Sequence, residues 1–160
     1  MNRIAIYPGT FDPFTNGHMS LVERGLKLFD SMIIAVGYNP SKKYLFNVDE
    51  RIAQIKDVVR VFEKVEVERF DGLLVDFAMK KNVNVVIRGL RAVSDFEYEL
   101  QLALMNRKLN RNLETVFLMP ALRYIFLSST IVKEAASFGG DISDLVPPGI
   151  ESALHDKFGK

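Results

Sequence analysis

Short apolar runs alternate along the chain with longer segments in which apolar residues recur every three or four positions. The short runs are typical of strands buried in a parallel sheet, and the longer segments are typical of helices with one buried face. The predicted strands are Arg3–Tyr7, Ser31–Gly37, Val65–Phe70, Val83–Ile87 and Thr115–Met119. The predicted helices are Gly17–Phe29, Val48–Val59, Leu73–Lys80, Ser94 to about Leu109, Ser129–Phe138, and one helix after Pro147 and Pro148.

Two of these helices begin with the pattern of a capping box, in which two residues three positions apart exchange side-chain and backbone hydrogen bonds. Asn47 and Glu50 form one such pair, and Ser94 and Glu97 form the other. The buried face predicted for the second helix consists of Phe96, Leu100, Ala103 and Leu104.

The regular alternation of strands and helices predicts a single α/β domain over residues 1–160, with a doubly wound, Rossmann-like sheet of five parallel strands and helices on both faces. Ligands of such sheets bind beyond the carboxyl ends of the strands, where the strand order reverses. In this chain the strand ends lead into Tyr7–His18, Tyr38–Phe46, Phe70–Leu74, Arg88–Asp95 and Pro120–Ser129. Ligand-binding side chains are therefore expected in these segments.

Composition narrows the possible functions. The net charge of +1 gives no reason to expect a nucleic acid as partner, so any phosphate chemistry must come from a local cationic site. The absence of cysteine excludes disulfides, thiolate catalysis and cysteine zinc sites. No apolar run reaches the length of a membrane span and no signal-peptide pattern opens the chain, which favours a cytoplasmic protein without a membrane partner.

The first segment, YPGTFDPFTNGH, contains glycines and prolines that favour a tightly turning backbone, together with polar side chains. Thr10 offers a hydroxyl and an amide, and glycine lets a phosphate approach the backbone. His18 falls in the first turn of the next helix, where free N–H groups and the helix dipole favour an anion. An isolated histidine at this place would more often be a surface or capping residue.

Cationic side chains follow two further strands. Lys42, in PSKK, could span a donor and an acceptor phosphate, or it could be solvated like most loop lysines. Arg88 and Arg91 flank Gly89 and suit bidentate phosphate recognition, with ion pairs to Asp95 or Glu97 as the alternative. Glu99 could bind a ribose, order Arg91, or be solvated.

The last segment, YIFLSST, places hydroxyl groups at a helix start. Ser128 is the predicted N-cap, and the converging amides and hydroxyls also suit an anion. Tyr124 could pack on an adenine ring.

The segment Thr15-Asn16-Gly17-His18 resembles the (H/T)xGH signature of the nucleotidyltransferase α/β superfamily, and Leu127–Thr130 with Lys133 resembles its ISSTxx(R/K) signature. The chain is most similar to the phosphopantetheine adenylyltransferase family, through YPGTFDPFTNGH, PSKK, IRGLRAVSDFEYELQLALMNRKL and VFLMP followed by SST. This resemblance implies transfer of the adenylyl group of ATP to 4′-phosphopantetheine, giving dephospho-coenzyme A and pyrophosphate. It also implies Mg2+ bound with ATP, feedback by coenzyme A and a homohexamer.

The resemblance further implies the roles of individual residues. His18, Lys42 and Arg91 would be catalytic, and no residue is assigned as a metal ligand. ATP would contact Thr10, Phe11, His18, Gly89, Leu90, Arg91, Glu99, Tyr124, Ile125, Phe126, Leu127, Ser128, Ser129 and Thr130. The acceptor would contact Thr10, Lys42, Leu74, Arg88, Leu102 and Asn106.

The implied reaction is an in-line displacement at the α-phosphorus of ATP by an acceptor phosphate oxygen, without a protein nucleophile. Catalysis would then consist of placement and electrostatic stabilisation. Two alternatives remain open: a nucleotidyltransferase for a different phosphorylated small molecule, and a non-catalytic ATP-binding regulatory domain. A Walker-type ATPase and a dinucleotide-binding dehydrogenase are disfavoured, because the chain has neither GxxxxGK[ST] nor GxGxxG after the first strand.

Overall fold

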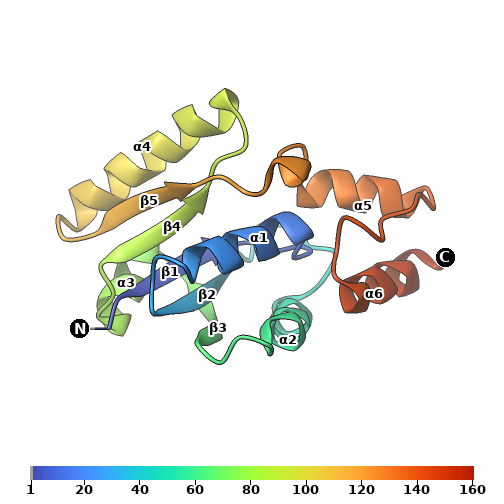
Figure 1. Ribbon diagram of the computed structural model, residues 1–160, viewed down its shortest axis with the longest axis horizontal. Helices are drawn as coiled ribbons and strands as arrows, with labels where there is room; N and C mark the ends of the chain where they lie inside the picture. Colours follow the sequence, from blue (N-terminus) through green and yellow to red (C-terminus); the bar gives the residue numbers. More distant parts are fainter. Residues whose placement is uncertain (1) are drawn as a thin grey trace.

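The structure, a computed structural model, describes residues 2–160 apart from the side chains of Val93 and Ser94, and is built around five parallel strands (Figure 1). These strands are β1 (Ile4–Gly9), β2 (Ser31–Tyr38), β3 (Val65–Asp71), β4 (Val85–Gly89) and β5 (Glu114–Leu118). Their order is β3-β2-β1-β4-β5, so the direction of winding reverses between β1 and β4. The predicted doubly wound α/β fold is confirmed.

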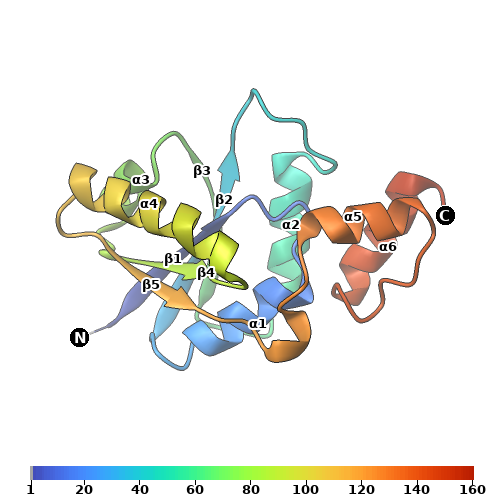
Figure 2. The ribbon, with the colours of Figure 1, turned by 90° about the horizontal axis from the view of Figure 1, so that it is seen from above.

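In the described part of the chain, six α-helices and one short 3-10 helix connect or follow the strands. They are α1 (Asn16–Gly25), α2 (Val48–Val59), α3 (Leu74–Lys81), α4 (Val93–Leu109), η1 (Leu122–Tyr124), α5 (Ser129–Ser137) and α6 (Pro148–Phe158). Figures 1 and 2 show α5 and α6 together at one end of the molecule, with the N-terminus at the opposite end. Within residues 2–160, no helix is long and apolar enough to cross a membrane.

The core lies on both faces of the sheet because successive strand residues point to opposite sides. Ile6 of β1 belongs to a buried cluster with Ala78 of α3. Ile34 of β2 belongs to a larger cluster on the other face, which includes Val22 of α1. Strands covered on both faces explain the nearly continuous apolar runs in the sequence.

The helix starts confirm one of the two predicted capping boxes. At α2, the Asn47 side chain accepts from Glu50 N at 2.9 Å, and Glu50 accepts from Asn47 N at 2.8 Å. The predicted box at Ser94 is wrong, because the N-cap of α4 is Ala92 and has no side-chain cap. Asp95 accepts from the backbone N–H of Arg91 at 3.3 Å instead, which ties down the start of α4. The side chain of Ser94 lies outside the described part of the chain.

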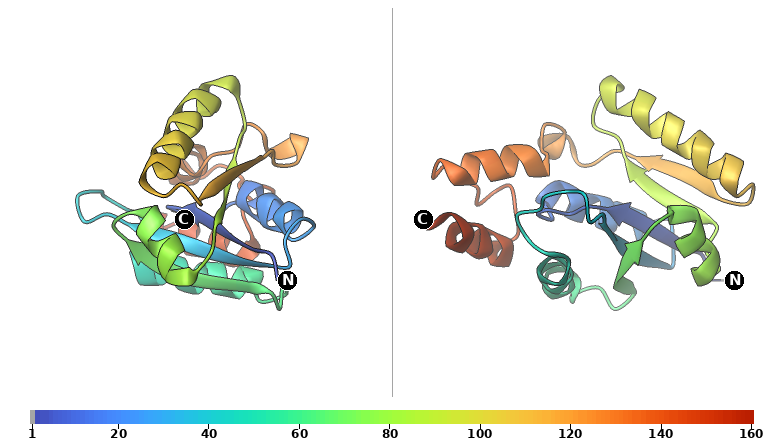
Figure 3. Two further views of the ribbon diagram at one scale, coloured as in Figure 1. Left: turned by 90° about the vertical axis from the view of Figure 1, so that its left-hand side faces the viewer. Right: turned by 180° about the vertical axis from the view of Figure 1, so that it is seen from behind.

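Two predicted helix features are also wrong. The first helix ends at Gly25 rather than Phe29, because the chain turns there toward β2; a Cβ at Gly25 would lie 2.6 Å from the sulfur of Met32. The predicted buried face of α4 is largely exposed: Phe96 and Leu104 are 44% and 59% exposed. Figure 3 shows α4 lying along β5 with its outer side away from the sheet. The apolar residues of α4 occur on all sides of the helix, so their spacing alone could not identify the side that faces the sheet.

Candidate active site

A cavity of about 290 Å³ opens at the carboxyl ends of β1 and β4, the edge that the strand order predicted. Three of the predicted segments contribute most of its wall. Its lining consists of Tyr7, Pro8, Gly9, Thr10, Phe11, Thr15, Gly17, His18, Leu21, Arg88, Gly89, Arg91, Asp95, Glu99, Pro120, Tyr124, Leu127, Ser128 and Ser129. We call it the first cavity.

The loop after β1 folds tightly and delivers His18 to the first cavity. Phe11 has a φ of 52°, an uncommon conformation for a residue other than glycine, and its ring fills the space beside Gly9. A Cβ at Gly9 would lie 2.7 Å from that ring, so only glycine fits there. Thr15 caps α1, and its backbone N–H donates to Nδ1 of His18 at 2.9 Å. His18 is thus fixed as the third residue of the helix, inside the first turn as predicted.

The imidazole of His18 is neutral in this environment. Its ring centroid lies 5.0 Å from that of Phe11 and 5.4 Å from that of Phe14. Burial, aided by the positive charges of Arg91 and Arg88, lowers the pKa of His18 to about 3. Because Nδ1 accepts a backbone hydrogen bond, the single ring proton resides on Nε2. His18 can therefore donate from Nε2 to a phosphoryl oxygen, but as a neutral group it brings no positive charge of its own.

Arg88 is held by a buried carboxylate before any ligand arrives. Its Nε and Nη2 both donate to Glu99 at 2.7 Å, and its Nη1 donates to the carbonyl of Pro8 at 3.0 Å. Burial is the largest single influence and lowers the pKa of Arg88, but the hydrogen bonds to Glu99, the charge of Glu99 and smaller contributions from Tyr7 and Tyr98 together outweigh it and raise that pKa. Glu99 is only 8% exposed, so it is neither solvated nor the residue that orders Arg91. It orders Arg88.

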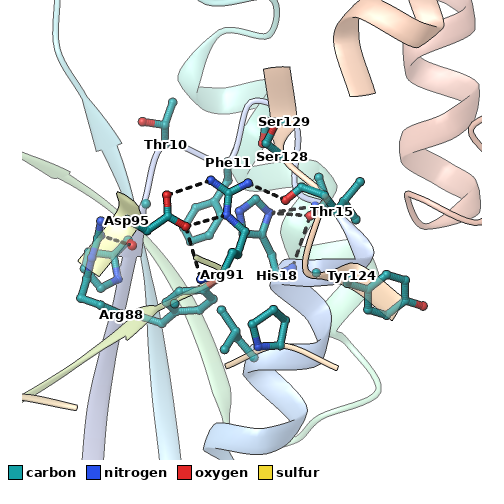
Figure 4. Close-up of a pocket in the computed structure, with 18 of the residues that line it drawn as sticks. Thr10, Phe11, Thr15, His18, Arg88, Arg91, Asp95, Tyr124, Ser128 and Ser129 are labelled. Carbon is teal, nitrogen blue, oxygen red and sulfur yellow. Dashed lines mark hydrogen bonds and ion pairs between the residues drawn. The ribbon is translucent and has the colours of Figure 1, made fainter. Parts of the chain in front are cut away.

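Arg91 bridges α4 and the loop before α5. Its Nε donates to Asp95 at 3.1 Å, so the ion pair considered as an alternative is present. Its Nη1 also donates to the carbonyl of Leu127 at 2.7 Å. Figure 4 shows Arg91 between Asp95 and the segment that carries Ser128, in the space that His18 also faces. The ion pair and the hydrogen bond to Leu127 thus hold Arg91 at the first cavity, although its side chain stays 37% exposed.

A second cavity of about 390 Å³ lies beside the first and shares Pro8, Gly9, Thr10 and Arg88 with it. All six residues predicted to contact the acceptor line it: Thr10, Lys42, Leu74, Arg88, Leu102 and Asn106. The segments after β2 and β3 and the side of α4 form the rest of its wall. The structure therefore brings the predicted acceptor residues together, whereas their contacts with a ligand stay a prediction.

Ten of the fourteen residues predicted to contact ATP line the first cavity, and the other four do not. The exceptions are Leu90, Ile125, Phe126 and Thr130. In the same loop, Ser128 is the N-cap of α5 as predicted, accepting from Ile131 N at 3.2 Å. The hydroxyl of Ser129 donates to the carbonyl of Pro13 at 2.8 Å, which joins this loop to the first one.

The sequence reasoning missed two groups that hold the first loop in place. Buried Asp12 accepts from Leu45 N and Phe46 N, each at 2.9 Å, and pairs with Lys133 at 3.3 Å. Arg51 of α2 is fully buried beneath the loop. A signal for Arg51 was available, because it lies on the same helical stripe as the apolar residues Val48, Ile55 and Val59.

Comparisons with known proteins agree with this architecture. Residues 6–135 match the Cytidylyltransferase-like family, so the chain is a nucleotidyltransferase of this class. A candidate nicotinate-nucleotide adenylyltransferase structure from Vibrio parahaemolyticus superposes with a TM-score of 0.68 over 97% of this chain and 92% of that one. At 19% identity, that likeness shows the fold alone.

Curated proteins with high sequence identity to this chain identify its family more narrowly. The phosphopantetheine adenylyltransferases of Desulfosudis oleivorans and Desulfatibacillum aliphaticivorans are 54% and 55% identical to this chain, over 98% of its length and 94% and 90% of theirs. That of Anaeromyxobacter dehalogenans is 53% identical over 100% of this chain and 98% of its own. The chain belongs to the phosphopantetheine adenylyltransferase family, as the sequence resemblance indicated.

Proposed function

We propose that this enzyme transfers the adenylyl group of ATP to 4′-phosphopantetheine, releasing pyrophosphate and producing dephospho-coenzyme A in coenzyme A biosynthesis. The observation that carries the proposal is the common wall of the two cavities, formed by Pro8–Thr10 and Arg88. ATP in the first cavity and the acceptor in the second would bring two phosphates together at this wall. Holding two reactants in this way supplies much of the catalytic effect when no covalent intermediate is used.

In the proposed reaction, an oxygen of the acceptor phosphate attacks the α-phosphorus of ATP. The bond from that phosphorus to the oxygen bridging to the β-phosphate breaks, and pyrophosphate leaves with the electron pair. Negative charge grows on the α-phosphoryl oxygens and on the leaving group. His18 would donate a hydrogen bond from Nε2, while Lys42 and Arg91 would supply the positive charge.

Arg88 is suited to the acceptor phosphate because it lines both cavities and keeps free donors. A guanidinium carries five N–H groups, and Glu99 and Pro8 occupy three of those of Arg88. The remaining donors can bind a phosphate while Glu99 fixes the plane of the group. Arginine at such a site binds phosphate with defined geometry, which a lysine would not.

Magnesium would enter as part of the MgATP substrate. Among the residues that the structure describes, no three or more His, Asp or Glu side chains converge as metal ligands. The carboxylates lining the first cavity, Asp95 and Glu99, are both paired with arginines. Because Mg2+ commonly binds through substrate phosphates and retained waters, this lining fits a metal that the nucleotide carries.

The proposal extends to assembly and regulation. A homohexamer is implied by the family resemblance, and the exposed apolar side chains of α4, such as Leu104 and Met105, favour burial against another copy. Feedback by coenzyme A is proposed to act by competition at the acceptor cavity, because its pantetheine arm matches that of the acceptor. A cytoplasmic location is proposed on the same resemblance.

The decisive test incubates the enzyme with MgATP and 4′-phosphopantetheine and identifies the products by mass. We expect dephospho-coenzyme A and one equivalent of pyrophosphate. A panel of other phosphorylated acceptors tests the first alternative, which predicts a better substrate among them. Saturable ATP binding without acceptor-dependent pyrophosphate would instead indicate a regulatory nucleotide-binding domain.

A further inference from the structure

Arg51 is a buried cation that contacts two of the loops bordering the acceptor cavity, those after β1 and β2. Its side chain is 0% exposed, although it belongs to one of the residue types that are almost never fully buried without a partner. Within residues 2–160, it has no ion pair with a carboxylate. Its direct partners are backbone carbonyls and one aromatic ring, and the charge of Asp12 favours its cationic form from farther away. The direct contacts therefore position chain segments.

The guanidinium of Arg51 joins three points of the backbone. Nη1 donates to the carbonyl of Thr10 at 2.6 Å and to that of Gly37 at 3.0 Å, and Nε donates to the carbonyl of Phe46 at 3.2 Å. Thr10 follows β1, and Gly37 lies near the end of the neighbouring strand β2. One side chain therefore ties the ends of two adjacent strands at the edge where the cavities open.

The contact with Thr10 stabilises an unusual backbone conformation. The next residue, Phe11, has a φ of 52°, and such a residue persists only when its surroundings over-determine it. Fixing the Thr10 carbonyl restrains the peptide that leads into Phe11. Thr10 lines both cavities, so this restraint acts on the wall that the two substrates share.

A second set of contacts leads from Arg51 to the Lys42 turn. The guanidinium carbon lies 4.2 Å from the ring centroid of Tyr44, a cation–π contact. The hydroxyl of Tyr44 accepts from the backbone N–H of Asn39 at 3.0 Å. The carbonyl of Asn39 in turn accepts from the N–H of Lys42 at 3.0 Å. The turn that carries Lys42 is thus connected to the same buried group.

We propose, on the basis of the function proposed above, that Arg51 is a positioning residue that sets Thr10 and Lys42 on opposite sides of the acceptor phosphate. It acts through Thr10 and Tyr44 and does not touch the substrates. The role needs the planar fork of arginine, because a lysine ammonium cannot reach three carbonyls and lie on a ring at once. The fork of Arg51 also leaves Nη2 buried without a hydrogen-bond partner among the described residues.

The test compares Arg51→Lys with a matched change at Arg60, the C-cap residue of α2, whose side chain is 76% exposed and pairs with Asp57. Acceptor KM, ATP affinity and thermal unfolding are measured for wild type, Arg51→Lys and Arg60→Lys. We expect Arg51→Lys to raise the acceptor KM about tenfold or more, as losing hydrogen bonds to a charged group does. ATP affinity should change less than about threefold, because Lys42 lines the second cavity and not the first, and Thr10 is one of many residues around the first. Arg60→Lys should match wild type.

Loss of acceptor and ATP affinity in equal proportion would assign Arg51 a structural role only, and an unchanged acceptor KM would also overturn the proposal. Tyr44→Phe provides an independent measurement should Arg51→Lys not fold, since it keeps the ring against Arg51 and removes the hydroxyl that accepts from Asn39 N–H at the wall of the acceptor cavity. It should raise the acceptor KM about threefold; no rise then refutes the connection to Lys42. A wild-type enzyme that makes no dephospho-coenzyme A would refute the proposed function instead, before any variant is compared.

Discussion

Two substitutions of His18 separate its catalytic role from its structural one. The side chain performs two tasks on different ring nitrogens: Nδ1 accepts the Thr15 backbone N–H at 2.9 Å, and Nε2 carries the proton that faces the first cavity. Glutamine is a natural capping-box residue at this helix position and can still accept the Thr15 N–H. His18→Gln therefore preserves the cap and removes the Nε2 donor. His18→Ala removes both.

The structure gives magnitudes for the two effects. The capping hydrogen bond contributes about 0.5–1.5 kcal/mol, and the ring contacts with Phe11 and Phe14 add about 0.5–1.5 kcal/mol each. His18→Ala removes all three contributions and should therefore lower the free energy of unfolding by about 1.5–4.5 kcal/mol, whereas His18→Gln keeps the cap and should lower it by about 1–3 kcal/mol. Loss of one preorganised donor to the transition state costs about 3–4 kcal/mol, or two to three decades of turnover, in both variants.

Urea unfolding measures the free energy of unfolding, and pyrophosphate release under saturating MgATP and acceptor measures turnover. Both variants should bind substrates almost normally, since the donor acts chiefly in the transition state. The reasoning fails if His18→Gln retains wild-type turnover. It also fails if glutamine destabilises the protein as much as alanine, because the cap would then not depend on Nδ1.

Three further outcomes follow from the polar contacts. In a His155→Gln background, nitrogen NMR should find His18 neutral with its proton on Nε2 from pH 5 to 8. The pKa of His18 is about 3 in the folded state and about 6.5 in the unfolded state, so the unfolded chain binds more protons between these two values. The free energy of unfolding should therefore fall as pH falls through this window. Glu99→Gln should cost about 2–3 kcal/mol in urea unfolding, less than for a fully buried pair because Arg88 is 26% exposed, and should raise the acceptor KM. Asp12→Asn should cost about 1–2 kcal/mol by the same measurement, since an amide cannot accept both backbone N–H groups and loses its ion pair.

Prediction from the sequence succeeded where the capping residues and the spacing of apolar residues indicate the same element. The helix Val48–Val59 was predicted with its observed bounds, because its capping box and apolar stripe point to the same residues. The run Ser31–Gly37 was found because burial on both faces leaves β2 almost free of polar residues, whereas the edge strand β3 alternates valines with Glu66 and Glu68. Phosphate-binding residue types at the strand ends located the cavities, since parallel strands deliver their carboxyl ends to one edge.

Prediction from the sequence failed where a residue's role depends on a contact with another element of the fold. Glu99 reads as an ordinary polar residue of a helix, and only the approach of Arg88 from β4 accounts for its burial. Arg51 was passed over for a similar reason, as its partners lie at positions 10, 37 and 46. The exposed side of α4 was misassigned because apolar residues occur all around that helix, and nothing in one chain says which of them meet the sheet.

The central place of β1 in the sheet has a consequence for biosynthesis. On the ribosome, one edge of β1 can pair with β2 as soon as position 38 has emerged, whereas its other edge waits for β4, which begins at Val85. The first cavity further needs Ser129, so nucleotide cannot stabilise the nascent chain until most of it has been translated. The early β–α–β units must therefore acquire their structure without help from ATP, relying on their own buried contacts.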